Sequence, residues 1–205
     1  MTKLLQNISW PLIYILGHLF FRVEIHCEED ISKLKGPLII ASNHIAPYDS
    51  FFLRLVFGRH TQLLPVRFMA SSYFNNPVIS FFWKIGVIKL IYIIFGVFTI
   101  PYIEGTENKL KPAARILEKG GVVYFFPEGT MSRSGIKPFK KGAATLALMT
   151  NTTILPLSYR IIVTPTIRRT FRVNVGKVIK IAQETEPIKA TFILQEIIEK
   201  LYGNH

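Results

Sequence analysis

A short apolar run leads into a polar turn in the stretch Pro37-Leu-Ile-Ile-Ala-Ser-Asn-His-Ile-Ala-Pro-Tyr-Asp-Ser50. The run Pro37–Ala41 is typical of a buried strand. Pro47 disfavours helix at the residue before it, so the chain turns before a helix can begin. This stretch therefore predicts a strand, a turn and then a helix over Asp49–Phe57.

His44 and Asp49 stand five positions apart in this turn, and the chain has only one other aspartate, Asp30. On a continuous helix that spacing turns two side chains roughly 140° apart, so the pair can meet only across a turn. Asp49 could cap the helix with one oxygen and reach the imidazole with the other. The pair indicates a histidine base oriented by a carboxylate. The alternative is a turn histidine beside an N-cap aspartate, without chemistry.

A second apolar run, Gly121-Val-Val-Tyr-Phe-Phe126, reads as a buried parallel strand. Pro127 ends the strand, and Gly129 allows a tight turn. Glu128 lies between them, directly after the apolar residues, and is expected to be buried despite its charge. Donor side chains follow at the carboxyl end of the strand, where ligands usually bind in open α/β sheets. These donors and the cations after them are Thr130, Ser132, Arg133, Ser134, Lys137, Lys140 and Lys141. The group suits a phosphate; the alternative is a solvated basic loop.

Strands and helices alternate along the rest of the chain, which predicts one α/β domain with a mixed, largely parallel sheet covered by helices on both faces. Further strands are expected at Arg22–Cys27, Val66–Ala70, Val97–Pro101, Ile154–Tyr159 and Arg172–Ile181. Further helices are expected at Leu4–Phe21, from Pro77 onward, and at Leu110–Glu118, Gly142–Thr150 and Lys189–Tyr202. In the last helix, a core-facing stripe of Phe192, Ile193, Ile197 and Leu201 is expected.

The composition is both basic and apolar: the net charge is +12 and 49% of the 205 residues are hydrophobic. A nucleic acid could use the charge, but so apolar a chain fits an anionic membrane surface better, and no nucleic acid is expected as a partner. Cys27 is the single cysteine, which excludes an internal disulfide and a multi-cysteine metal site. No other residue spacing predicts a metal site.

Two uncharged apolar stretches, Ile8–Phe21 and Leu90–Ile103, are each 14 residues long. A spanning helix needs about 20 apolar residues, and no small-residue cleavage site follows the first stretch, which argues against a signal peptide. We therefore expect residues 1–21 to form a membrane-interface helix, with monotopic attachment at the cytoplasmic face, and residues 22–205 to form the catalytic domain. A short re-entrant or spanning piece is the alternative.

Four segments, in this order, resemble the glycerolipid acyltransferase family, in particular its lysophosphatidate-acyltransferase-like members. They are the HX4D block in Ser42–Ser50, Phe126-Pro-Glu-Gly-Thr130, Pro138-Phe-Lys-Lys-Gly-Ala143 and Ile154-Leu-Pro-Leu157. The resemblance covers roughly Val23 to Gly176. It implies transfer of a fatty acyl group from acyl-CoA or acyl-carrier protein to a glycerolipid hydroxyl, such as that of 1-acyl-glycerol-3-phosphate, in phospholipid biosynthesis and without a cofactor or metal.

The resemblance also implies roles for individual residues. His44 would be the general base and Asp49 would hold its imidazole. Glu128 and Gly129 would shape the acceptor site, Arg133 would bind the acceptor phosphate, and Pro156 would form part of a substrate wall. The substrate-binding residues expected on this basis and from the basic loop are Asn43, Pro127, Glu128, Gly129, Thr130, Arg133, Lys141 and Pro156.

The chain departs from the family pattern where many members carry basic residues. Tyr102 stands where an arginine is usual, Met131 replaces another, and Ser71 and Ser72 stand where a lysine is common. The departures leave open a different lyso-lipid or an amino-acid-derived lipid as the acceptor, or a catalytically silent lipid-binding module. A basic nucleic-acid-binding protein is supported by charge alone. From composition, an acyl groove is expected to be lined by Phe51, Phe52, Phe81 and Phe82.

Overall fold

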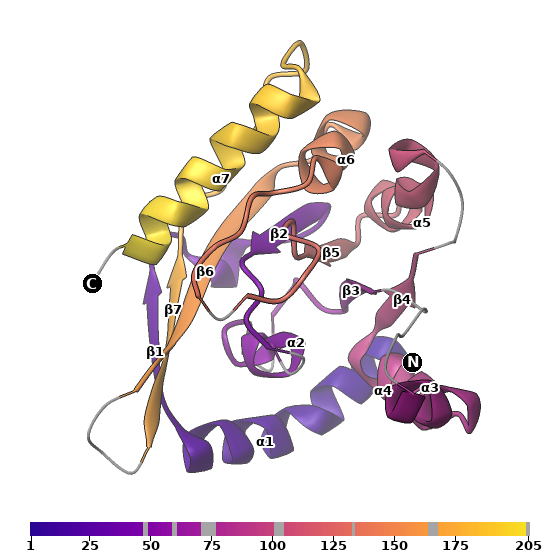
Figure 1. Ribbon diagram of the computed structural model, residues 1–205, viewed down its shortest axis with the longest axis vertical. Coiled ribbons are helices and arrows are strands. Elements are labelled where there is room, and N and C mark those ends of the chain that lie inside the picture. Colours follow the sequence, from indigo (N-terminus) through magenta and orange to yellow (C-terminus); the bar gives the residue numbers. More distant parts are fainter. Residues whose placement is uncertain are drawn as a thin grey trace.

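The computed structural model of the chain describes residues 1–46, 49–58, 61–70, 77–100, 105–132, 134–163 and 168–203, but not the side chains of residues 51–53 (Figure 1). Seven strands form one sheet in the order β1-β7-β6-β2-β5-β3-β4. The strands are β1 (Phe21–Cys27), β2 (Leu38–Ser42), β3 (Val66–Ala70), β4 (Val97–Thr99), β5 (Val122–Phe125), β6 (Ile154–Ile162) and β7 (Arg169–Val175). Among the described strands, the β6–β7 pair is antiparallel and the other pairs are parallel. The predicted mixed, largely parallel sheet is confirmed.

The middle of the sheet explains the two continuous apolar runs. β2 lies between β5 and β6, and every residue of β2 and of β5 is buried. Successive side chains of a strand point to opposite faces, so a strand covered on both faces needs apolar residues at every position. Ile40 accordingly belongs to one core cluster and its neighbour Ile39 to the other.

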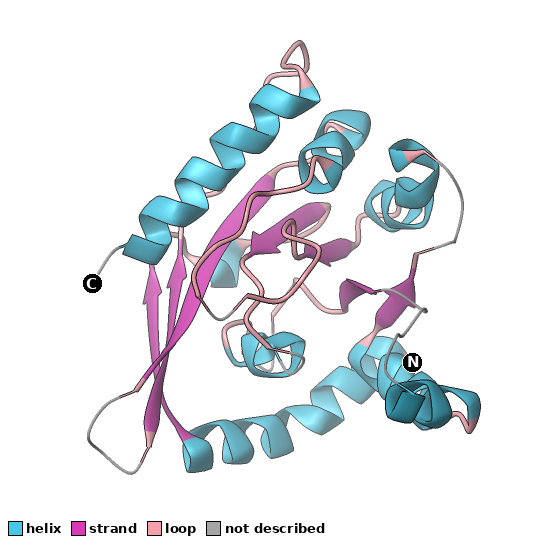
Figure 2. Ribbon diagram, viewed as in Figure 1, coloured by secondary structure: helices cyan, strands magenta, loops and turns pink. Residues whose placement is uncertain are grey.

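Helices cover both faces of the sheet (Figure 2). One face packs against α5 (Thr106–Glu118), α6 (Gly142–Thr150) and α7 (Pro187–Gly203), which contribute residues such as Leu110, Ala144 and Leu194 to the core. The other face packs against α1 (Thr2–Phe20) and the short 3-10 helix η2 (Leu53–Leu55), and α2 (Asp49–Phe52) contacts both of these helices. A second 3-10 turn, η1 (Ile31–Lys33), follows β1.

The helix predicted at Leu4–Phe21 is present as α1, although Phe21 already belongs to β1. Gly17 lets α1 approach η2 closely, because a Cβ atom there would lie 2.6 Å from the Cδ1 atom of Leu55. The opposite side of α1 exposes an apolar stripe at helical spacing, formed by Leu4, Ile8, Leu12, Ile15 and Leu19.

The apolar segment after β3 folds as two short helices, α3 (Pro77–Lys84) and α4 (Val87–Phe95). Within the described ranges, no single helix has the length and apolar character required to cross a bilayer. Together α3 and α4 reach those limits, but they are bent by 79° with respect to each other.

Several predicted boundaries are wrong. The helix expected to reach Phe57 ends at Phe52 and continues as η2. The strand expected over Arg172–Ile181 is β7, which begins earlier and ends at Val175; Ile179 makes an isolated antiparallel bridge with Ile154. The strand expected to end at Pro101 ends at Thr99, and residues 101–104 lie outside the described part.

The predicted core stripe of the last helix is also largely wrong. Phe192 and Ile193 are exposed, and of the predicted set only Leu201 is buried. The helix buries instead Ala190, Thr191, Leu194, Ile198 and Leu201. The buried side of the helix therefore combines the small residues Ala190 and Thr191 with Leu194, Ile198 and Leu201, and it is displaced along the helix from the predicted stripe.

Candidate active site

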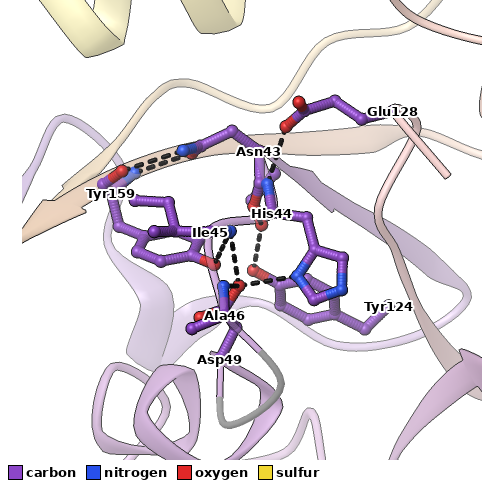
Figure 3. A network of polar contacts seen from close by, with 9 residues as sticks. Asn43, His44, Ile45, Ala46, Asp49, Tyr124, Glu128 and Tyr159 are labelled. Carbon is purple, nitrogen blue, oxygen red and sulfur yellow. Dashed lines mark hydrogen bonds and ion pairs between the residues drawn. The ribbon is translucent and has the colours of Figure 1, made fainter. Parts of the chain in front are cut away.

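His44 and Asp49 meet in the turn that follows β2 (Figure 3). The Nδ1 atom of His44 lies 2.6 Å from the Oδ2 atom of Asp49. The carboxylate side chain is 1% exposed and the imidazole 21% exposed. An ionised carboxylate can only accept a hydrogen bond, so we assign the imidazole proton to Nδ1, which leaves Nε2 as the basic nitrogen.

The carboxylate of Asp49 also organises the turn itself. Its Oδ2 atom accepts the backbone N–H groups of Ile45 at 2.7 Å and Ala46 at 2.9 Å, in addition to the imidazole. The other oxygen, Oδ1, is buried and has no hydrogen-bond partner among the described residues. Asp49 lies inside the first turn of α2, so the expected cap of this helix by one oxygen is not found in the described part, whereas the contact with the imidazole is.

Asn43 and Tyr159 tie this turn to β6. The side-chain amide of Asn43 donates to the carbonyl oxygen of Tyr159 and accepts from its N–H group, both at 2.9 Å. The hydroxyl of Tyr159 accepts the N–H group of Ile45 at 3.0 Å. Asn43 is buried and its two polar atoms are engaged with the backbone, so this placement supports a positioning role in place of the expected contact with substrate.

Glu128 links the two signature segments. Its carboxylate accepts the N–H groups of His44 at 2.7 Å and Lys137 at 2.9 Å, one on each oxygen. Burial raises the pKa of this carboxyl above its usual value, while the two N–H groups oppose that shift. The expected burial of Glu128 is confirmed. The carboxylate joins the histidine turn to the basic loop, so its effect on an acceptor site would be indirect.

Aromatic stacking holds the imidazole of His44 in place. The rings of His44 and Phe126 are stacked, with centroids 4.1 Å apart and planes 18° from parallel. Phe126 in turn contacts Tyr124, whose hydroxyl donates to the Oγ atom of Ser42 at 2.7 Å. Full burial raises the pKa of Tyr124 well above its usual value, so this phenol stays protonated as a donor. The imidazole is therefore held by packing as well as by Asp49.

The loop after β5 continues from this support. The N–H group of Ser132 donates to the carbonyl oxygen of His44 at 2.7 Å, and the carbonyl oxygen of buried Pro127 accepts the N–H group of Lys140 at 2.8 Å. Gly129 has a positive φ of 66°, and a Cβ atom there would lie 2.9 Å from the Nζ atom of Lys140. Gly129 and Thr130 are exposed.

The cations of this loop are placed as follows. Lys137 donates from Nζ to the carbonyl oxygen of Met131 at 3.0 Å. Lys140 and Lys141 are exposed, with Lys141 at the start of α6. Arg133 lies outside the described residues, as do Tyr102, Ser71 and Ser72. The structure thus places the lysines on the loop that contacts the histidine turn.

Pro156 does not join this group. It is buried in β6, where it pairs with Ala41 of β2, and its Cγ atom would lie 3.1 Å from a Cβ atom added to Gly176. A Cβ atom added to Gly176 would also lie 2.8 Å from the Cδ1 atom of Leu201 in α7. Pro156 fills the core beside α7, and its expected place in a substrate wall has no support in this arrangement.

The predicted acyl groove is likewise not supported. Phe81 and Phe82 are exposed on α3, away from the core of the sheet, and the side chains of Phe51 and Phe52 are not described. In the described part of the chain, no group of three or more His, Cys, Asp or Glu residues could hold a metal ion.

Comparisons with known proteins assign the chain to a family. The profile of the family described as Acyltransferase matches residues 22–160. The chain therefore belongs to the acyltransferase family.

Named relatives narrow this class. The chain is 29% identical over 142 residues to the chloroplastic 1-acyl-sn-glycerol-3-phosphate acyltransferase BAT2 of Brassica napus. The aligned region covers 68% of this chain and 37% of that protein. The chain is also 29% identical over 133 residues to the 1-acyl-sn-glycerol-3-phosphate acyltransferase of Borreliella burgdorferi, covering 63% of this chain and 48% of that protein. The chain thus spans less than half the length of these relatives.

A solved structure confirms the fold. The crystal structure of PlsC, the 1-acyl-sn-glycerophosphate acyltransferase of Thermotoga maritima, has a TM-score of 0.66 with this chain. The similarity covers 97% of this chain and 77% of PlsC, at 17% sequence identity. The helix-covered sheet described above is therefore the same fold as that of PlsC.

Proposed function

We propose that the protein is a membrane-associated O-acyltransferase that moves a fatty acyl group from a thioester donor to the hydroxyl of a glycerolipid. The observation that carries this proposal is the 2.6 Å contact between His44 and Asp49, in a chain of the acyltransferase family. Acyl-CoA or acyl-carrier protein is the proposed donor, and neither a metal nor a cofactor is required.

The proposed reaction uses Nε2 of His44 as the general base. Nε2 takes the proton of the acceptor hydroxyl while the hydroxyl oxygen attacks the thioester carbonyl carbon. An ester bond forms, the carbon–sulfur bond breaks, and the leaving thiolate recovers the proton from the imidazolium. Asp49 stabilises that imidazolium through Nδ1, the task of the carboxylate in a hydrolytic triad. No covalent acyl-enzyme is needed, because the acceptor itself is the nucleophile.

For the acceptor we propose a lyso-lipid such as 1-acyl-glycerol-3-phosphate, the substrate in the names of the relatives. Its phosphate would bind at the basic loop through Arg133, Lys140 and Lys141, beside exposed Thr130. The replacement of usual basic residues by Tyr102, Ser71 and Ser72 favours a second candidate within the same chemistry, a lyso-lipid with another headgroup or an amino-acid-derived lipid.

The exposed apolar stripe of α1 supports attachment to a membrane surface. Leu4, Ile8 and Leu12 are exposed on this helix, which contains no acidic residue. A helix of this kind lies in the interface with its apolar side in the acyl boundary. The net charge of +12 favours an anionic leaflet, and we propose the cytoplasmic one.

The test is a transfer assay with labelled acyl-CoA and labelled acyl-carrier protein across a panel of lyso-lipid and amino-acid-derived acceptors. We expect ester formation with one donor class, and we expect His44→Ala to abolish it while the protein still binds vesicles. Unchanged turnover of the His44→Ala variant would rule out this base. Lipid binding without transfer from any donor would instead identify a catalytically silent lipid-binding module.

A further inference from the structure

The helices α3 and α4 are apolar, and neither has a buried residue. In α4, Val87–Phe95, Lys89 is the sole charged residue, and Leu90 and Ile93 are 58% and 48% exposed. A helix that is apolar on all sides belongs either in a protein core or in a membrane. Of α4, only Phe95 packs against a core cluster. The exposed apolar side chains of this helix therefore require another apolar environment that removes them from water.

The shape of the pair favours the membrane interface over a span. The helices have 8 and 9 residues, so they are about 12 and 14 Å long, less than half of a hydrocarbon core of about 30 Å. Their axes are bent by 79°. At the break, the N–H groups of Ile85 and Gly86 donate to the carbonyl oxygens of Phe81 and Trp83, each at 3.1 Å. These backbone donors are therefore already satisfied when water is excluded.

The pair is joined to the N-terminal helix (Figure 1). The side chain of Gln6 in α1 donates to the carbonyl oxygens of Val66 at 2.7 Å and Phe95 at 2.9 Å, and accepts the N–H group of Val66 at 3.1 Å. Beside it, Arg67 donates to the carbonyl oxygen of Gly96 at the end of α4, at 2.9 Å. These bonds fix α4 against α1, so the two apolar surfaces form one unit.

The polar residues of this unit suit an anionic bilayer. Neither α1 nor residues 77–100 contain an acidic residue, whereas Lys3, Lys84 and Lys89 are exposed. The two tryptophans of the chain, Trp10 and Trp83, both lie in it. The Nζ atom of Lys89 lies 5.6 Å from the centre of the Trp83 ring. Tryptophan and lysine are the residues that anchor proteins at the level of lipid headgroups.

We propose that α1, α3 and α4 together form a membrane platform, in which the bent α3–α4 pair lies in the headgroup and acyl boundary of an anionic bilayer as a second contact beside α1. The inference rests on the proposed function for its membrane setting. Binding to vesicles requires no chemistry, however, so the platform and the acyl transfer can fail independently.

The two tryptophans allow each half of the platform to be observed separately. Trp10→Phe leaves Trp83 as the reporter of α3, and Trp83→Phe leaves Trp10 as the reporter of α1. With vesicles of equal parts phosphatidylcholine and phosphatidylglycerol, we expect the emission of Trp83 to shift to shorter wavelength and to be quenched by bromine on the upper acyl chain. A response of Trp10 with no response of Trp83 would overturn the proposal.

Substitutions on exposed positions test the same contact by partitioning. We expect Ile93→Glu and, independently, Leu90→Glu to weaken vesicle partitioning by about tenfold or more, because each replaces an apolar contact with a charge. Phe192→Glu is the matched control, since Phe192 is 64% exposed on α7. Unchanged partitioning of both α4 variants, with wild-type circular dichroism, would overturn the proposal. So would a concentration-dependent dimer that buries α4 and keeps it from vesicles.

His44→Ala separates this inference from the proposed function. We expect this variant to partition and to quench as the wild type does, even though transfer is lost. If wild-type protein binds vesicles through α4 but no donor and acceptor react, the membrane platform stands and the proposed acyl transfer does not. If transfer occurs in detergent while the emission of Trp83 does not change with vesicles, the proposed acyl transfer stands and the membrane platform does not.

Discussion

Asp49 combines two tasks on one oxygen atom, and an isosteric substitution separates them. In Asp49→Asn, an amide oxygen at the Oδ2 position can still accept the N–H groups of Ile45 and Ala46. The charge that stabilises the imidazolium is lost. We expect the turn to keep its fold and kcat to fall by about 10²–10⁴, measured in the transfer assay. A variant that retains wild-type kcat would show that the carboxylate only shapes the turn.

Glu128 accepts two backbone N–H groups, so glutamine cannot replace it. In Glu128→Gln, the amide nitrogen would face the N–H group of either His44 or Lys137, donor against donor. We expect a loss of about 1–3 kcal/mol in the free energy of unfolding, measured by urea titration, together with reduced transfer. Glu118→Gln, on the surface of α5, is the control. Equal stability of the two variants would contradict the proposed link between the two segments.

The sequence indicated the partners that lie close together along the chain and missed those that depend on strand register. His44 and Asp49 are five positions apart and separated by Pro47, so their meeting could be derived locally. Tyr159 reaches the same turn because β6 pairs with β2, over a separation of 114 residues. No local pattern marks that tyrosine. The same reason explains why Asn43 was expected to face substrate, although its amide is used by Tyr159.

At the scale of elements, Gln6 is the residue that holds α1 to β3 and α4. Gln6→Leu would leave the carbonyl oxygens of Val66 and Phe95 without this donor. We expect a loss of about 1–3 kcal/mol in the free energy of unfolding, measured by urea titration. Asn7→Ala is the control, because the side-chain oxygen of Asn7 has no hydrogen-bond partner among the described residues. If both variants lose the same stability, Gln6 does not act through these bonds.

Element types were predictable where one physical requirement dominated. Continuous apolar runs predicted β2 and β5, because strands buried on both faces tolerate little else. The core face of α7 was predicted wrongly, since Ala190, Leu194 and Ile198 belong to the core cluster whereas the large side chain of Phe192 is exposed. Helical spacing allows more than one apolar stripe when large apolar residues occur on neighbouring sides of a helix, and the spacing alone does not decide which side faces the sheet.

At the scale of the whole molecule, alternation of strands and helices indicated a largely parallel sheet, but not the order of its strands. The order β1-β7-β6-β2-β5-β3-β4 puts β2 near the centre and brings the loops after β2 and β5 together. That neighbourhood unites the histidine turn with the basic loop. It arises from pairing between strands more than eighty residues apart, for which the sequence gives no local signal.

The charge of the whole molecule predicts how membrane binding responds to salt. From residue 108 onward the chain has 16 Lys and Arg residues against 6 acids, and exposed charges are screened beyond about 8 Å at physiological ionic strength. We expect sodium chloride to weaken binding of the wild type to vesicles containing phosphatidylglycerol, measured by sedimentation, and to leave a weaker, salt-resistant binding to phosphatidylcholine alone. Ile93→Glu should remove most of the salt-resistant part, because that part comes from apolar contact. Binding to both vesicles that is equally strong and independent of salt would show that the net charge has no part in attachment.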